Sequence, residues 1–296
     1  MMTPERAFLS EKALPVATVL LALIVLWYGG AVWLNAQPLI DRYAREGRAW
    51  QMSELVDDAM GMERPILPAP HQVLGELDRT VLEVAPTSRR SLLYHGWVTL
   101  SAALLGFGAG ALLGIALAIG IVHLRTLERS LLPWIIASQT VPILAIAPMI
   151  IVVLGSIGFV GLLPKAIISA YLCFFPVTIG MVKGLNSPEP IHLDLVRTYN
   201  ASAFQIFCKL RWPSALAFLF ASLKVAVALA IIGAIVGELP TGAQAGLGAR
   251  LLTGSYYGQT VQIWAALIVS AVLAALSVAA IGVAQRLTVA RMGGRL

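Results

Sequence analysis

Residue types that carry out covalent chemistry are few in this sequence, and they do not cluster. The four histidines form no H-E-x-x-H pair, and the two cysteines, Cys173 and Cys208, are too few and too differently placed for a disulfide framework or a thiolate metal site. The sequence also contains no Ser/His/Asp arrangement, no haem or flavin motif and no G-x-x-x-x-G-K-[ST] phosphate loop. We therefore expect no catalytic residue, no metal and no cofactor, and we do not expect the chain to bind ATP itself.

Polar side chains inside apolar segments are better candidates, because they could hydrogen-bond a solute that crosses a membrane. An ionisable residue at membrane depth is costly, so it is a functional hypothesis by default. The alternatives stay open: helix-to-helix hydrogen bonds for the neutral side chains, a lysine reaching back to the inner surface, and an interfacial carboxylate. The candidate path residues are Gln139, Thr140, Tyr171, Lys224 and Glu238.

The elements that must position these residues are long apolar segments. The chain is 58% hydrophobic and 12% charged, with a mean hydropathy of +0.83, whereas about a quarter of the residues of a soluble domain are charged. A helix needs about 20 apolar residues to cross a bilayer. The sequence therefore predicts an all-α, polytopic membrane protein with six transmembrane helices. The predicted spans are Ala13–Leu34, Trp97–Leu124, Leu131–Gly155, Gly161–Val182, Ala215–Leu239 and Val261–Ala284.

The distribution of Lys and Arg predicts the orientation of these spans. Six spans place both termini on one side, and the positive-inside rule makes the side that is richer in Lys and Arg the cytoplasm. The opposite short loops hold only Arg250, with Lys165 at a span end. A formal charge of +6 without a basic, aromatic-rich run does not indicate a nucleic-acid partner. The cytoplasmic basic residues would be Arg6, Lys12, Arg125, Arg129, Lys183, Arg197, Lys209, Arg211, Arg286, Arg291 and Arg295.

The spans divide the chain into four parts. Residues 1–34 form the cytoplasmic N-terminus and first span, 35–96 an external segment, 97–284 a five-helix core, and 285–296 a cytoplasmic tail. In the external segment, His71–Val84 has amphipathic helical spacing. In the core, Gly106, Gly110 and Gly114 permit close helix packing, either within the chain or in a dimer. Prolines predict kinks in the third and fourth spans.

The loop at residues 184–213, between the fourth and fifth predicted spans, has the pattern of two short helices joined by a tight turn. Asn200 suits the turn because asparagine tolerates positive φ. Ser202 is expected to cap the second helix and Pro213 to end it. On that helix, Phe204, Phe207 and Cys208 are spaced to share one face, and an aromatic face on a cytoplasmic loop indicates a partner protein.

The stretch from Asp194 to Pro213 resembles the EAA loop of bacterial ABC importer permeases. Asp194 stands at the acidic position of that motif, Asn200 at its glycine, and Leu210-x-Trp212-Pro213 at its hydrophobe-x-Leu-Pro ending. The sequence departs from the motif in having Asp for Glu, Leu195-Val196 for the alanine pair and Asn for Gly. All three departures preserve a helix-turn-helix shape. Further pairs, such as Ala201-Ser202 and Gly237-Glu238, are similar to the nitrate/sulfonate/taurine branch.

The resemblance implies a type I importer permease in a bacterial inner membrane. Such a permease is a transport subunit and not itself an enzyme. Its partners would be a separate ABC ATPase, an external substrate-binding protein and a second permease copy. The solute would be a sulfonate, taurine, nitrate or a pyrimidine-like heterocycle. The loop residues that would couple to the ATPase are Asp194, Arg197, Asn200, Ala201, Ser202, Phe204, Phe207, Leu210 and Pro213.

The alternative function is a secondary transporter or channel without an ATPase. It predicts several buried carboxylates, or broken helices in matched halves of the chain. The six spans hold almost no acidic residues, and the loop between the fourth and fifth spans would have no role. A membrane scaffold or intramembrane enzyme is a third alternative, which predicts a catalytic cluster that the sequence lacks.

Overall fold

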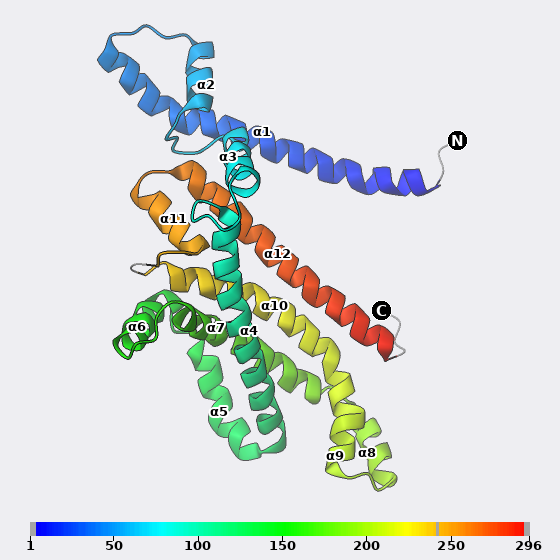
Figure 1. Cartoon of the computed structure of the whole chain (residues 1–296). Coiled ribbons are helices and arrows are strands. Elements are labelled where there is room, and N and C mark those ends of the chain that lie inside the picture. Colours follow the sequence, from blue (N-terminus) through cyan, green and yellow to red (C-terminus); the bar gives the residue numbers. More distant parts are fainter. Residues whose placement is uncertain (1–3, 241–242, 293–296) are drawn as a thin grey trace. The chain divides into compact units, whose positions relative to one another are not determined.

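The computed structural model describes residues 4–240 and 243–292, with side chains from Leu14 onward (Figure 1). Three basic residues used to predict the orientation therefore lie outside the described side chains: Arg6, Lys12 and Arg295. All regular elements in the described part are helices. The chain forms two compact units, one of residues 1–91 with 251–267, and one of residues 92–250 with 268–296.

The first unit is built on α1 (Pro4–Glu46), a helix of 43 residues that continues well past the predicted span end at Leu34. Its polar C-terminal part packs against α2 (Met52–Gly61) through Leu39, Tyr43, Leu55 and Ala59. The predicted amphipathic helix is confirmed as α3 (Pro70–Leu77) followed by the π-helical η1 (Asp78–Glu83).

One buried side chain, Asn35, ties the extended chain before α3 to α1. Its Oδ1 accepts a hydrogen bond from the Ile66 amide at 2.7 Å, and its Nδ2 donates to the Leu67 carbonyl at 2.9 Å. The rings of Trp27 on α1 and Trp264 on α12 (Thr260–Arg291) lie 5.0 Å apart. The chain at Ile66 and Leu67 is thus held against α1.

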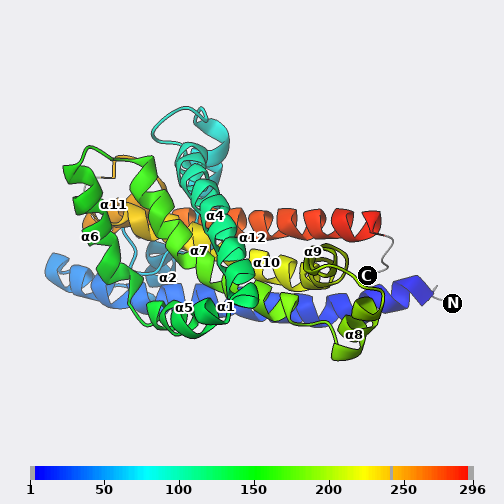
Figure 2. The ribbon, with the colours of Figure 1, turned by 90° about the horizontal axis from the view of Figure 1, so that it is seen from below.

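The second unit contains α4 (Leu92–His123), α7 (Leu162–Leu185) and α10 (Trp212–Glu238), and α7 packs along both of the others (Figures 1 and 2). The glycines of α4 make its contact with α7 possible. A Cβ on Gly110 would lie 2.7 Å from the Ala170 carbonyl oxygen, and one on Gly114 2.8 Å from the Phe174 carbonyl oxygen. Packing within the chain therefore explains these glycines.

The third predicted span, Leu131 to Gly155, is not one straight helix, and the prolines of this segment predicted such an interruption. It is a pair, α5 (Arg125–Ser138) and α6 (Ile143–Ser156), bent by 98° at the break. Pro142 has extended backbone geometry and is the N-cap residue of α6. A proline also disfavours helical geometry in the residue before it. Pro133, Pro148 and Pro176, in contrast, lie inside helices that continue through them.

By length and hydropathy, five described helices can cross a membrane, and the bent pair would make a sixth span. The five are α1, α4, α7, the α9–α10 segment and α12. The remaining short helices are α8 (Pro190–Thr198), α9 (Ala203–Ile206), the π-helical η2 (Phe207–Arg211) and α11 (Leu247–Tyr256). The fold class predicted from the sequence is confirmed.

Candidate coupling loop and membrane path

The loop between α7 and α10 is a capped helix-turn-helix. Asn200 has φ +52°, and the Ala201 amide donates to the Val196 carbonyl at 3.4 Å while the Asn200 amide donates to the Arg197 carbonyl at 2.8 Å. These two bonds form a Schellman motif, in which a left-handed residue closes the end of a helix. The predicted turn at Asn200 is therefore confirmed.

Ser202 starts the second helix with a capping box. The Gln205 amide donates to Ser202 Oγ at 3.3 Å, and the Ser202 amide donates to Gln205 Oε1 at 2.8 Å. Such reciprocal bonds satisfy two backbone donors that a helix start leaves open. The predicted cap is confirmed, and the loop has a defined shape rather than an extended conformation.

The prediction that Pro213 ends the second helix is wrong. The helix continues from α9 through η2 into α10, so that Ala203–Glu238 is one helical segment of 36 residues. Pro213 lies inside this segment, just after the π-helical turn η2, and proline removes one backbone hydrogen bond of a continuing helix. The π-helical turn directly before it shifts the backbone bonding, and the Ser214 hydroxyl donates to the Leu210 carbonyl at 2.8 Å.

The predicted aromatic face also needs correction. Phe204 is 73% exposed and Cys208 is exposed, but Phe207 is half-buried against the core of the second unit. The Phe207 ring lies 5.5 Å from the His123 ring and 5.9 Å from the Trp212 ring. Phe207 therefore packs against the helices of the second unit, whereas Phe204 and Cys208 are exposed.

Sequence reasoning missed three exposed apolar side chains on α8 and at its C-cap residue, Tyr199. Ile191, Leu195 and Tyr199 are 70%, 54% and 80% exposed, and their spacing of four residues places them on one side of the helix. That spacing was the available signal. Together with Phe204 they form what we call the apolar loop face. Asp194 and Arg197 form an exposed ion pair beside it, at 3.2 Å.

The break between α5 and α6 exposes two of the candidate path residues, Gln139 and Thr140. The Tyr171 hydroxyl of α7 donates a hydrogen bond to the Ser138 carbonyl at the end of α5. Non-helical backbone at membrane depth occurs only where it is buried in protein or lines a water-filled cavity. The structure thus brings Tyr171 to the same place as Gln139 and Thr140.

Lys224 and Glu238 lie apart from that break and from each other. Lys224 is half-buried, and its ammonium donates to Gln285 Oε1 of α12 at 2.7 Å. Glu238, at the end of α10, is fully buried. The five candidate path residues therefore occupy three places.

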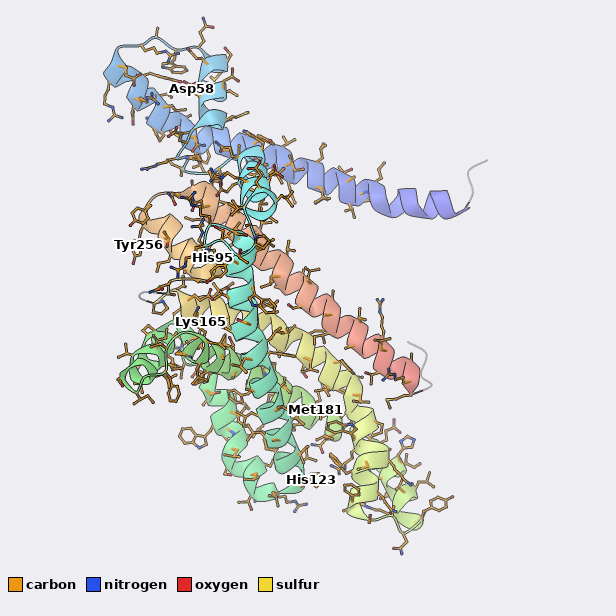
Figure 3. The ribbon with its side chains drawn as sticks, viewed as in Figure 1. Asp58, His95, His123, Lys165, Met181 and Tyr256 are labelled. Carbon is orange, nitrogen blue, oxygen red and sulfur yellow. The ribbon has the colours of Figure 1, made fainter. Side chains whose placement is uncertain are left out.

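Glu238 is the centre of a buried polar cluster that the sequence did not reveal. Lys165 Nζ of α7 lies 3.2 Å from its Oε1, Thr99 Oγ1 of α4 lies 2.9 Å from its Oε2, and the Gly248 amide donates to Oε2 at 2.8 Å. His95 also belongs to the cluster, because its Nδ1 accepts a hydrogen bond from the Gly246 amide at 2.9 Å. Lys165 and His95 are labelled in Figure 3. The partners are far from Glu238 in sequence, so no local pattern connects them.

The apolar loop face and the Glu238 cluster lie at opposite ends of α10. Glu238 is the last residue of α10, whereas α8 and α9 lie beyond its first residue, as Figures 1 and 2 show. Among the described residues, no three His, Cys, Asp or Glu side chains gather in an arrangement that could hold a metal ion.

Comparison with known proteins gives the family. The model of the binding-protein-dependent transport system inner membrane component family matches residues 110–294. A probable ABC transporter permease of Haemophilus influenzae is 33% identical over 69% of this chain and 78% of its own length. The formylaminopyrimidine transport permease ThiX of Halalkalibacterium halodurans is 33% identical over 62% of this chain and 68% of its own.

A more distant relative falls in the branch that the sequence motifs resemble. This relative is the protein of Bacillus subtilis named "putative aliphatic sulfonates transport permease protein SsuC". It is 26% identical over 72% of this chain and 73% of its own length. With a family model that covers more than half of its length, the chain belongs to the inner membrane components of binding-protein-dependent transport systems, the permease subunits of ABC transporters.

Proposed function

We propose that this permease imports a small heterocyclic solute and is driven by a separate ATPase that docks on the loop at residues 184–213. The observation that carries the proposal is the apolar loop face, on a capped helix-turn-helix whose second helix continues without a break into a membrane helix. A partner that moves this face would move α10 as well.

The chemistry of the apolar loop face suits a helix that docks in a groove. Single exposed apolar residues are ordinary on protein surfaces, but a row at a spacing of four residues is the pattern of a helix that lays its apolar side into a partner. Ile191 and Leu195 of α8 form that row with its C-cap residue Tyr199, and Phe204 extends the row across the turn. The exposed Asp194–Arg197 pair would lie at the rim of such an interface.

ATP would bind in the partner, since the sequence of this chain has no phosphate loop. The excess of Lys and Arg beside the loop and near the C-terminus supports an orientation with the loop and both termini in the cytoplasm. Each chain supplies one coupling loop, whereas the resembled importers use two ATPase subunits. We therefore include a second copy of this permease in the assembly, as a homodimer.

The break between α5 and α6 is the part of the path for which the structure offers the most support. Its irregular backbone and exposed Gln139 and Thr140 need water, protein or solute as hydrogen-bond partners. Lys224 could add a positive charge deeper along α10, where its ammonium donates a hydrogen bond to Gln285 Oε1. Such a path would open to one side of the membrane in one state of the permease and to the other side in a second state. The ATPase and the binding protein would shift the permease between these states because they bind them with different affinities.

A pyrimidine-like heterocycle is our first choice of solute. A relative named for formylaminopyrimidine transport is 33% identical to this chain, compared with 26% for one named for aliphatic sulfonates. A ring with several amide-like groups could use neutral donors and acceptors such as Gln139, Thr140 and Tyr171. A sulfonate would instead require a fixed positive charge, for which Lys224 is available.

The experiment is uptake by proteoliposomes that contain the permease with its partner ATPase and binding protein. Formylaminopyrimidine should accumulate only when ATP is supplied, and an excess of an aliphatic sulfonate should not compete. Competition by the sulfonate would overturn the choice of solute. Uptake without ATP, driven by an ion gradient, would overturn the import mechanism in favour of a secondary transporter.

A further inference from the structure

The Glu238 cluster joins four parts of the second unit at one point. Glu238 ends α10, Lys165 lies on α7, and Thr99 lies on α4. The fourth part is the chain segment Ala245–Gly248, which leads into α11. Lys165 Nζ donates both to Glu238 Oε1 at 3.2 Å and to the Ala245 carbonyl at 3.1 Å. Two helices and this segment are thus held directly to the end of α10.

Three successive backbone amides of the segment point into the cluster. The Gly246 amide donates to His95 Nδ1 at 2.9 Å, the Leu247 amide to Thr99 Oγ1 at 2.9 Å, and the Gly248 amide to Glu238 Oε2 at 2.8 Å. These amides form the start of α11, where a negative charge is favourable. Glu238 therefore acts as the anion at the start of a helix that belongs to another part of the chain.

The segment approaches Glu238 closely because of two glycines. Gly246 has φ +126°, a conformation that L side chains rarely adopt, and a Cβ there would overlap the Glu238 carboxylate. A Cβ on Gly248 would lie 2.8 Å from Glu238 Cβ. The glycines thus let the backbone itself, rather than a side chain, make the contact.

The ion pair is a poor device for stability alone. Replacing a buried ion pair with well-packed apolar side chains is often neutral or stabilising, whereas removing one partner leaves an uncompensated charge. Glu238 is fully buried and the Lys165 side chain is 10% exposed. Such a pair instead defines one arrangement of the segment on α10, because any displacement separates charges in a poorly solvated site.

The other end of the same helical segment carries the apolar loop face. Ala203–Glu238 has 36 residues, which corresponds to about 54 Å at 1.5 Å per residue. We infer that the Glu238 cluster is a latch that passes displacement of the Ala245–Gly248 segment along α10 to the loop at residues 184–213. Glu238 and Lys165 are its positioning residues. This inference rests on the proposed function, in which that loop meets an ATPase.

The test measures ATP hydrolysis by the permease–ATPase complex in nanodiscs, first alone and then with its binding protein. Glu238→Gln keeps the size and acceptor oxygen of the side chain but removes its charge. Because the latch would hold the resting arrangement, the variant should raise basal hydrolysis about fivefold or more and bring the stimulation by binding protein close to onefold. Lys165→Met should do the same, and the double variant should do no more than either single one.

Two further variants separate a latch from simple damage. Lys165→Arg keeps the charge and should keep wild-type coupling. Cys173→Ala removes another buried hydrogen bond between α7 and α10, from Cys173 Sγ to the Ala226 carbonyl at 3.0 Å, and should also leave coupling unchanged. Equal loss of basal and stimulated hydrolysis in Glu238→Gln, or wild-type values of both, would overturn the latch.

If Glu238→Gln does not assemble, Thr99→Val is the substitute, because with almost no change of volume it removes the hydroxyl that bonds both Glu238 and the Leu247 amide. It should raise basal hydrolysis in the same direction, and unchanged hydrolysis would count against the latch. Failure of the proposed function has a different signature, namely a wild-type permease that neither assembles with the ATPase nor responds to the binding protein.

Discussion

The ring of Phe207 on η2 meets the ring of His123 at the end of α4, with centroids 5.5 Å apart and an interplanar angle of 62°. This edge-on contact links the loop at residues 184–213 to a second membrane helix besides α10. Phe204, three residues earlier, is 73% exposed. The two phenylalanines of the loop should therefore respond differently to truncation.

Phe207→Ala should destabilise the permease, whereas Phe204→Ala should not. Full removal of a buried phenylalanine costs about 3–5 kcal/mol, so a half-buried one should cost about 2 kcal/mol. Thermal unfolding in detergent would detect the loss for Phe207→Ala and an unchanged midpoint for Phe204→Ala. Equal midpoints for both variants would show that Phe207 is not part of the packed core.

The contact of α4 with α7 should depend on particular glycines. Gly110→Val would place a side chain against Ala170 and Cys173, since even a Cβ there would lie 2.7 Å from both the Ala170 carbonyl oxygen and Cys173 Cβ. Overpacking of this kind costs about 1–3 kcal/mol or more. Gly108→Val is the matched control, because a Cβ at Gly108 meets nothing within 4 Å. Size-exclusion chromatography should show folded protein for the control and aggregation for Gly110→Val.

The two cysteines test the orientation in the membrane. Cys208 is exposed on the loop, whereas Cys173 is buried. A membrane-impermeant maleimide should label the permease in inside-out vesicles and leave it unlabelled in right-side-out vesicles. Cys208→Ser should abolish the labelling. Labelling of right-side-out vesicles would place the loop outside and remove the ATPase from its reach.

The hydroxyl of Tyr171 should matter for transport. Tyr171→Phe leaves the Ser138 carbonyl without this part-buried donor at the break between α5 and α6, and a hydrogen bond of this kind contributes about 0.5–1.5 kcal/mol. We expect the rate of uptake to fall several-fold while assembly with the ATPase is retained. Tyr257→Phe, at an exposed tyrosine, is the control. Wild-type uptake by Tyr171→Phe would remove Tyr171 from the path.

Local signals were sufficient to predict the spans and the loop turn. Hydropathy alone located the membrane helices, and Asn200 and Ser202 act within a few residues of themselves, so their turn and cap could be predicted. The effect of each proline could not be predicted in this way, because Pro142 breaks a helix while Pro176 lies inside one. Which outcome occurs depends on neighbouring helices that can satisfy the freed backbone groups.

Contacts between distant residues explain the remaining differences. Glu238 was recognised as a costly charge, but Thr99 and Lys165 are 139 and 73 residues away from it in sequence, and nothing local pairs them. The spacing of Phe204, Phe207 and Cys208 predicts one shared face on a regular α-helix, whereas a π-helical turn begins at Phe207 and its side chain is half-buried. The apolar row of α8 could have been predicted from the four-residue spacing of Ile191, Leu195 and Tyr199.

The central claim, that the apolar loop face binds a separate ATPase, is tested most directly by co-purification. Leu195→Asp and Phe204→Asp should each leave the permease folded, because both side chains are exposed, but should remove the co-expressed ATPase from the purified complex. Met52→Asp, at an equally exposed apolar residue in the first unit, should retain it. ATPase recovered at the wild-type ratio with Leu195→Asp and Phe204→Asp would contradict the account.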